Sequence, residues 1–184
     1  KGVTVTVNLP SRSLVLLSGA PGSGKSTFAK RHFLWTQIVS SDRCRAMVCD
    51  DEENMAVHHQ TYSLLQHIVR LRLSLGRFTV IDSTALERKH RIHYVSLAKD
   101  YHFHPVAILF DVPYELCVQQ NERRDRRVPL EAIRHYHAML QETKRSIWEE
   151  GFAEIFVLNA EQIRTAQISF RDKEPKERDN KRRN

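Results

Sequence analysis

The chain has 184 residues, of which 41% are hydrophobic and 28% are charged, and its net charge is +7. This balance indicates one folded domain with a sizeable core and excludes a chain that is disordered throughout. There is no run of 18 apolar residues, and the segment before Pro10 has no apolar signal-peptide core, so we expect no membrane association and no secretory leader. The three cysteines, Cys44, Cys49 and Cys117, form no close pair, which favours reduced thiols and a cytoplasmic location.

Two strands are predicted near the start of the chain. Residues 3–7 alternate valine with threonine, which is typical of an edge strand that would end at Pro10, and residues 14–17 form an apolar run. A motif of the form G-x-x-x-x-G-K-[ST] follows this second strand and precedes a helical pattern at residues 28–33. The motif consists of Gly19, Ala20, Pro21, Gly22, Ser23, Gly24, Lys25, Ser26 and Thr27.

A strand, a glycine-rich loop and a helix in this order predict a phosphate-binding loop. The glycines allow several backbone N–H groups to point inward, and the start of the helix adds partial positive charge. Lys25, which we expect to face solvent, would reach the β- and γ-phosphates of ATP, and the Ser26 hydroxyl would ligate Mg²⁺. An ordinary glycine-rich turn is the alternative, and the flanking pattern disfavours it.

A second candidate region begins after a short strand predicted at residues 37–40, where Asp42 lies near the start of a helix. A carboxylate there can accept the proton of an attacking alcohol, or it can cap the helix. Arg45 follows three residues later on the same helical face, where it could hold the acceptor or a flanking phosphate. Residues 52–75 then predict one long amphipathic helix, which begins in an acidic stretch and ends at Gly76.

Apolar residues 78–81 followed by Asp82 resemble a Walker B strand, whose carboxylate would hold Mg²⁺; a role as a turn residue is the alternative. Further along, the pattern predicts helices at residues 87–98, 114–122 and 129–149. It also predicts strands at residues 106–110 and 155–158, the latter being the last.

A basic run separates two of these helices and predicts a small mobile lid. It contains Arg123, Arg124, Arg126 and Arg127, whose guanidinium groups can contact phosphate, although a solvated helix face is the alternative for at least half of them. The alternation of strands and helices predicts an α/β fold with a parallel sheet covered by helices on both faces. The domain would span residues 1–170, and the charged residues 171–184 would form a tail or linker.

The motif at residues 19–27, the Ser-Ser-Asp-Arg-Cys-Arg stretch at residues 40–45, the acidic residues 50–54 and the segment 76–84 together resemble the kinase domain of bacterial polynucleotide kinase-phosphatases. The resemblance covers residues 14–158 and implies transfer of the ATP γ-phosphate to a 5′-hydroxyl end of RNA or DNA. It implies Asp42 as general base, Arg45 as acceptor ligand, and Arg124 and Arg127 as lid arginines. It also implies phosphatase and ligase modules as partners.

The chain departs from this family at two places. Gln120 stands where the family often has arginine, which leaves open whether Arg123 or Arg126 compensates, and residues 82–85 read Asp-Ser-Thr-Ala where Asp-Ala-Thr-Asn is frequent. Two other functions therefore remain as alternatives, a kinase for a small alcohol or nucleoside and a non-catalytic module controlled by ATP.

Overall fold

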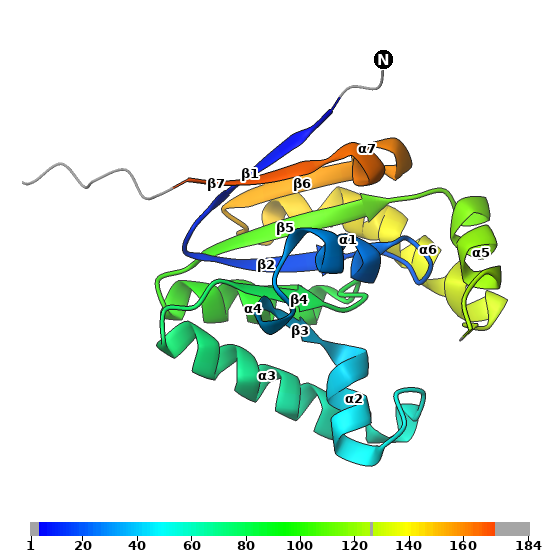
Figure 1. The fold of residues 1–184 in the computed structure, drawn as a ribbon, viewed down its shortest axis with the longest axis horizontal. Coiled ribbons are helices and arrows are strands. Elements are labelled where there is room, and N and C mark those ends of the chain that lie inside the picture. The colour runs from blue at the N-terminus through cyan, green and yellow to red at the C-terminus, as the bar shows by residue number, and fades with distance from the viewer. Residues whose placement is uncertain (1–3, 126, 172–184) are drawn as a thin grey trace, which may run out of the picture.

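The computed structural model describes residues 4–125 and 127–171. Its centre is a five-stranded sheet in which all strands are parallel, as predicted (Figure 1). In order across the sheet, the strands are β3 (Ile38–Ser40), β4 (Thr79–Asp82), β2 (Ser13–Ser18), β5 (His104–Asp111) and β6 (Glu154–Asn159). None of the helices in the described part of the chain is long and apolar enough to cross a membrane.

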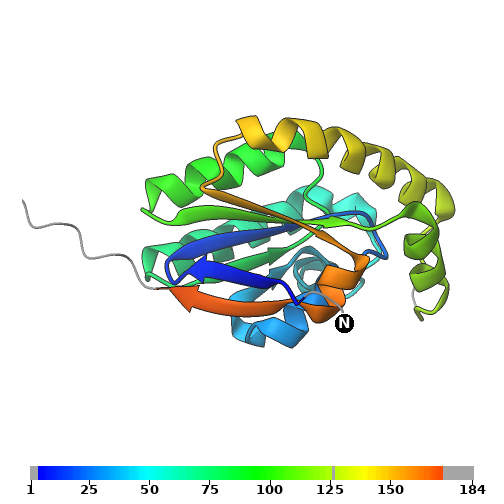
Figure 2. The same ribbon diagram turned by 90° about the horizontal axis from the view of Figure 1, so that it is seen from above.

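Seven α-helices within the described residues surround this sheet (Figures 1 and 2). They are α1 (Lys25–His32), α2 (Ser41–Cys49), α3 (His58–Ser74), α4 (Arg88–Asp100), α5 (Tyr114–Glu122), α6 (Leu130–Ser146) and α7 (Ala160–Thr165). Three short 3₁₀ turns, Trp35–Gln37, Met55–Val57 and Ile147–Glu149, connect some of them.

Strand β2 shows why both faces of the sheet are covered. Its side chains alternate, so Val15 and Leu17 pack into a core with α1 and α7, whereas Leu14 and Leu16 pack into a second core with α3 and α4. The strand is buried along its whole length. The apolar run of β2 is therefore continuous because both faces of the strand are buried, as is typical of parallel sheets.

The two ends of the described chain differ from the prediction. The first strand, β1, is Thr6–Pro10 rather than residues 3–7, and it pairs in parallel with β7 (Gln167–Arg171) in a separate two-stranded sheet. The strand at residues 155–158 is therefore not the last, and Arg171 belongs to the folded domain rather than to the tail. Residues 172–184 of the predicted tail lie outside the described residues. Pairing partners so far apart in sequence leave no local signal.

The helix predicted at residues 52–75 begins later, at His58. Asp50 ends α2 in a left-handed conformation with φ 58°, and the acidic residues after it form a loop. Asn54 then starts the 3₁₀ turn by accepting a hydrogen bond from the Ala56 N–H at 3.0 Å. The acidic residues were expected to lie at a helix N-terminus, but they precede the helix. In this loop, the backbone carbonyl of Glu52 accepts a hydrogen bond from Arg45.

Three of the predicted site elements meet at the edge formed by the carboxyl ends of the central strands. Asp82 lies beside Leu17 of β2 on one side and beside Ser40 of β3 on the other. The phosphate-binding motif, Asp82 and the start of α2 are therefore neighbours. Helix α5 lies beyond the end of β5 and, with the start of α6, extends from this edge (Figures 1 and 2).

Candidate active site

The motif at residues 19–27 forms a tight turn between β2 and α1. Gly22 and Gly24 have φ angles of 80° and 91°, which side chains other than glycine rarely adopt. A Cβ atom on Gly22 would also lie 2.3 Å from the carbonyl oxygen of Cys117. Helix α5 thus packs directly on the turn.

Lys25 is buried, contrary to the expected exposure to solvent. Its Nζ donates hydrogen bonds to the carbonyl oxygens of Gly19 at 2.8 Å and Ala20 at 2.9 Å. Burial lowers its pKa to about 8, while the nearby charge of Asp82 opposes this shift. The charges of Asp42 and Arg124 also act on it. The ammonium group is therefore held inside the loop, where a phosphate would displace the weaker carbonyl contacts.

Ser26 and Asp82, the two predicted Mg²⁺ ligands, lie near each other. The Asp82 carboxylate is almost fully buried, and the Ser26 side chain is close enough to act on its pKa. Burial raises the pKa of Asp82, and Lys25 and Ser26 act in the opposite direction. A hydroxyl and one carboxylate beside a phosphate site are ligands that suit Mg²⁺, which typically completes its shell with water and substrate phosphates.

The loop after Asp82 is fastened to the phosphate-binding turn. The Gly19 N–H donates to the Thr84 carbonyl at 3.0 Å, and the Ser18 hydroxyl donates to the Ala85 carbonyl at 3.0 Å. Arg91 also donates to the Ala85 carbonyl, at 3.2 Å, and makes two hydrogen bonds of 2.7 and 2.6 Å to the buried carboxylate of Glu150. This buried ion pair, which the sequence did not reveal, connects α4 and the end of the 3₁₀ turn after α6 to the loop.

Asp42 and Arg45 form an ion pair on α2. Arg45 Nη1 donates to Asp42 Oδ1 at 2.9 Å and to the Glu52 carbonyl at 2.7 Å. The Asp42 side chain is 46% exposed, whereas that of Arg45 is 6% exposed. The cap of α2 is Ser40, whose hydroxyl accepts a hydrogen bond from the Arg43 N–H. Of the two roles proposed for Asp42, the capping role therefore belongs to a different residue.

Three of the lid arginines, Arg123, Arg124 and Arg127, are exposed, and Arg126 lies outside the described residues. Arg124 is close enough to Lys25 for its charge to lower the pKa of that lysine. Asn121 was not singled out from the sequence, yet its side chain closes this loop through hydrogen bonds of 2.9 Å to both the N–H and the carbonyl of Val128.

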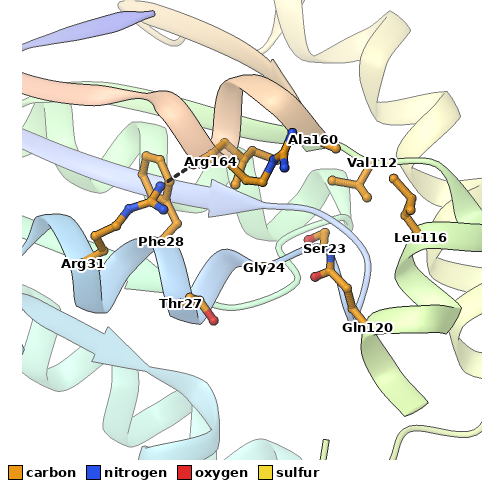
Figure 3. Close-up of a pocket in the computed structure, with 11 residues that line it drawn as sticks. Ser23, Gly24, Thr27, Phe28, Arg31, Val112, Leu116, Gln120, Ala160 and Arg164 are labelled. Carbon is orange, nitrogen blue, oxygen red and sulfur yellow. Dashed lines mark hydrogen bonds between the residues drawn. The ribbon is translucent and has the colours of Figure 1, made fainter. Parts of the chain in front are cut away.

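A pocket of about 430 Å³ opens beside the turn, between α1, α5 and α7 (Figure 3). Its size is within the usual range for small-molecule sites. The lining combines apolar and polar side chains, and Figure 3 shows Gln120 reaching from α5 toward Ser23 and Gly24. The lining residues are Ser23, Gly24, Thr27, Phe28, Arg31, Val112, Leu116, Gln120, Ala160, Ile163 and Arg164.

The pocket is lined in part by residues of the motif at positions 19–27. Thr27 of the motif faces it, and Arg31 at its edge donates a hydrogen bond to the Ile163 carbonyl. Phosphates held in the turn would leave the attached nucleoside in the pocket. Gln120, which stands where an arginine is frequent, lines this pocket beside Ser23 and Gly24 of the turn. Asp111, another polar strand end, pairs with Lys144 at 2.7 Å instead.

Comparisons with known proteins agree with the fold. The solved structure of the Pnkp1/Rnl/Hen1 RNA repair complex contains a chain that is 27% identical, with a TM-score of 0.64 over 76% of this chain and 47% of that one. The fold is thus of the P-loop kinase type, as predicted.

Two curated viral relatives carry polynucleotide kinase in their names. A bifunctional polynucleotide phosphatase/kinase of Acanthamoeba polyphaga mimivirus is 31% identical over 117 residues, which are 61% of this chain and 24% of that protein. A bifunctional polynucleotide kinase/RNA ligase of Autographa californica nuclear polyhedrosis virus is 27% identical over 139 residues, which are 68% of this chain and 20% of that protein. The chain thus spans a quarter or less of these relatives. Because the sequence profile of the AAA domain family, AAA_33, matches residues 14–143, more than half of the chain, the protein belongs to that family.

Proposed function

We propose that this protein is an ATP-dependent polynucleotide 5′-hydroxyl kinase. The observation that carries the proposal is the Asp42–Arg45 pair, which lies at the same sheet edge as Lys25, Ser26 and Asp82. The viral relatives and the RNA repair complex support the choice of a polynucleotide as the acceptor.

In the proposed reaction, the 5′-hydroxyl oxygen of the acceptor attacks the γ-phosphorus of ATP, and the bond to the β-phosphate oxygen breaks to release ADP. Asp42 accepts the proton of the hydroxyl, which is consistent with its exposed carboxylate. Lys25 and Arg124 stabilise the charge that develops on the transferred group, and Arg127 joins them when the lid closes. Ser26 and Asp82 would hold Mg²⁺, which supplies neutralisation of the phosphate charges.

Arg45 would bind the acceptor phosphate next to the reacting end. Its guanidinium is almost fully buried, and its Nε has no hydrogen-bond partner among the described residues. A buried donor without a partner is costly, so a ligand that accepts from it would bind favourably. The relatives' names combine the kinase with phosphatase or RNA ligase activities, and we infer that the present domain works with modules of these kinds.

The direct test is transfer from labelled ATP in the presence of Mg²⁺. We expect label on 5′-hydroxyl oligonucleotides of RNA or DNA and none on a panel of small alcohols and nucleosides. Label on a small alcohol alone would replace the proposal by a small-molecule kinase, and the absence of any transfer despite ATP binding would favour the ATP-controlled module.

The salt dependence of acceptor binding gives one prediction. Each neutralised phosphate of a single strand contributes about −0.7 to the slope of log affinity against log salt. Arg45→Ala should weaken oligonucleotide binding and make the slope shallower by about one such contact, with ATP affinity unchanged. Fluorescence anisotropy between low and moderate salt measures this. Arg43→Ala is the matched control, because Arg43 is on the same helix but lies over Trp35. An unchanged slope in Arg45→Ala, or a salt-independent wild type, contradicts the assignment.

The pKa of Lys25 gives a second prediction. In the free protein it is about 8, and bound phosphates should raise it, so ATP binding takes up a proton when the pH exceeds this value. The affinity for ATP should accordingly be flat below pH 7.5 and fall by up to about tenfold per pH unit above pH 8. Calorimetry in two buffers of different ionisation enthalpy should detect proton uptake at pH 9 but little at pH 7. Lys25→Arg keeps its proton and should show none at either pH, whereas equal uptake in both proteins refutes the explanation.

A further inference from the structure

Three aromatic rings form a column that the proposed transfer step does not use. His58 and Tyr62 are one turn apart on α3, and their ring centroids are 4.6 Å apart. His90, in the first turn of α4, stacks on Tyr62 with a centroid distance of 4.8 Å and an angle of 25° between the planes. We refer to His58, Tyr62 and His90 as the aromatic column.

The column lies at the sheet edge that carries the candidate active site. Helix α3 ends before β4 and α4 follows β4, so both helices begin at the carboxyl edge of this parallel sheet. All three rings are in the first two turns of these helices. Burial raises the pKa of Tyr62 to about 12, and the charges of Glu87, Arg45 and Asp42 and the hydroxyl of Tyr136 on α6 also act on it. The column therefore lies near the pair that we propose to act on the acceptor, Asp42 and Arg45.

The composition of the column differs from that of the neighbouring core. Deeper along α3, the inward positions are the fully buried Leu65 and Val69. His58, in contrast, is exposed, and Tyr62 and His90 are half-buried. The outer end of the column is therefore open to solvent, and the charge of the buried Arg45 reaches its middle ring, Tyr62. A flat ring surface beside a cation is the combination that binds single-stranded nucleic acid, because bases stack and phosphates pair with the cation.

We propose that the aromatic column is the stacking surface for the 5′-terminal nucleobase of a single-stranded acceptor, with His58 as the ring that contacts the base. This inference rests on the proposed function and adds to it the way in which a polynucleotide end is distinguished from a small alcohol, which has no base to stack. Since every base has a flat face, the surface tolerates any terminal base.

The test compares two oligonucleotide acceptors that differ only in the presence of the base on the 5′-terminal nucleotide. With the wild type, we expect the abasic acceptor to have a KM about tenfold higher, which corresponds to ~1.4 kcal/mol, and a similar kcat. His58→Ala should raise the KM of the normal acceptor to that of the abasic one and leave the abasic KM unchanged. His58→Phe should restore the difference. His59→Ala is the matched control, because His59 is also exposed and contributes no ring to the column.

The KM for ATP and the melting temperature should be the same in all of these variants. Equal KM values for the two acceptors with the wild type overturn the stacking surface while leaving the kinase proposal intact. A rise in both KM values in His58→Ala overturns it as well, because it indicates a structural role. Failure to phosphorylate either acceptor overturns the proposed function itself, and the stacking surface with it.

Discussion

Lys25→Ala is expected to lower the turnover of phosphoryl transfer by at least a factor of about a hundred to a thousand. The ammonium group is held inside the phosphate-binding turn by the carbonyls of Gly19 and Ala20, so it is already positioned where the charge of the transferred group develops. Each factor of ten in rate corresponds to roughly 1.4 kcal/mol of transition-state stabilisation, and a fixed charge in a buried site supplies several times that amount.

Fold and activity must be separated in this experiment, because Lys25 is buried rather than exposed. The lowered pKa of Lys25 means that burial of its charge already disfavours the folded state. Removal of the Lys25 side chain should therefore leave the melting temperature near that of the wild type. Steady-state rates and thermal melting of Lys25→Ala, with Lys99→Ala as control at the far end of α4, test both points. A rate within tenfold of the wild type in a folded variant contradicts the role of Lys25.

Asp42→Asn is expected to retain ATP binding and to lose turnover by about a hundredfold or more, the usual contribution of a general base. The amide keeps the shape of the side chain and an oxygen that can accept from Arg45, which is 2.9 Å away. It removes only the ability to take the proton of the acceptor hydroxyl. The helix itself should be unaffected, because its cap is Ser40.

Rapid-quench measurement of transfer to a 5′-hydroxyl oligonucleotide, together with ATP titration, distinguishes these effects. Asp100→Asn, at the exposed end of α4, is the matched control. Near-normal turnover in Asp42→Asn contradicts the proton-accepting role. A loss of ATP affinity equal to the loss of turnover contradicts it too, since a group that acts on the acceptor should not contribute to binding the donor.

Short-range features of this protein were determined by the sequence alone. The glycine-rich motif with Lys25 and Ser26 needs particular residues within a single turn, and the apolar run of β2 needs only that both faces be buried, so both could be predicted. The same is true of α5, whose bounds at Tyr114–Glu122 agree with the prediction, because Pro113 precedes it and its pattern is local.

Features that depend on which distant segments meet were decided by the tertiary structure. Ser40 and Asp82 are 42 positions apart, and only the strand register places them side by side. The pairing of β1 with β7 and the ion pair between Arg91 and Glu150 likewise join segments with no local relation. Their energies come from packing and burial, which a pattern of spacing does not encode.

Burial also decided the roles that the sequence left open. Asp42 and Ser40 are two residues apart, and both suit a helix cap, but the start of α2 at Ser41 gives the cap to Ser40. Lys25 looked exposed because loops usually are, yet α5 covers the turn closely enough that Gly22 has no room for a side chain. The sequence therefore determined which chemical groups are present, and the packing of helices against the sheet decided which of them are desolvated, paired and able to react.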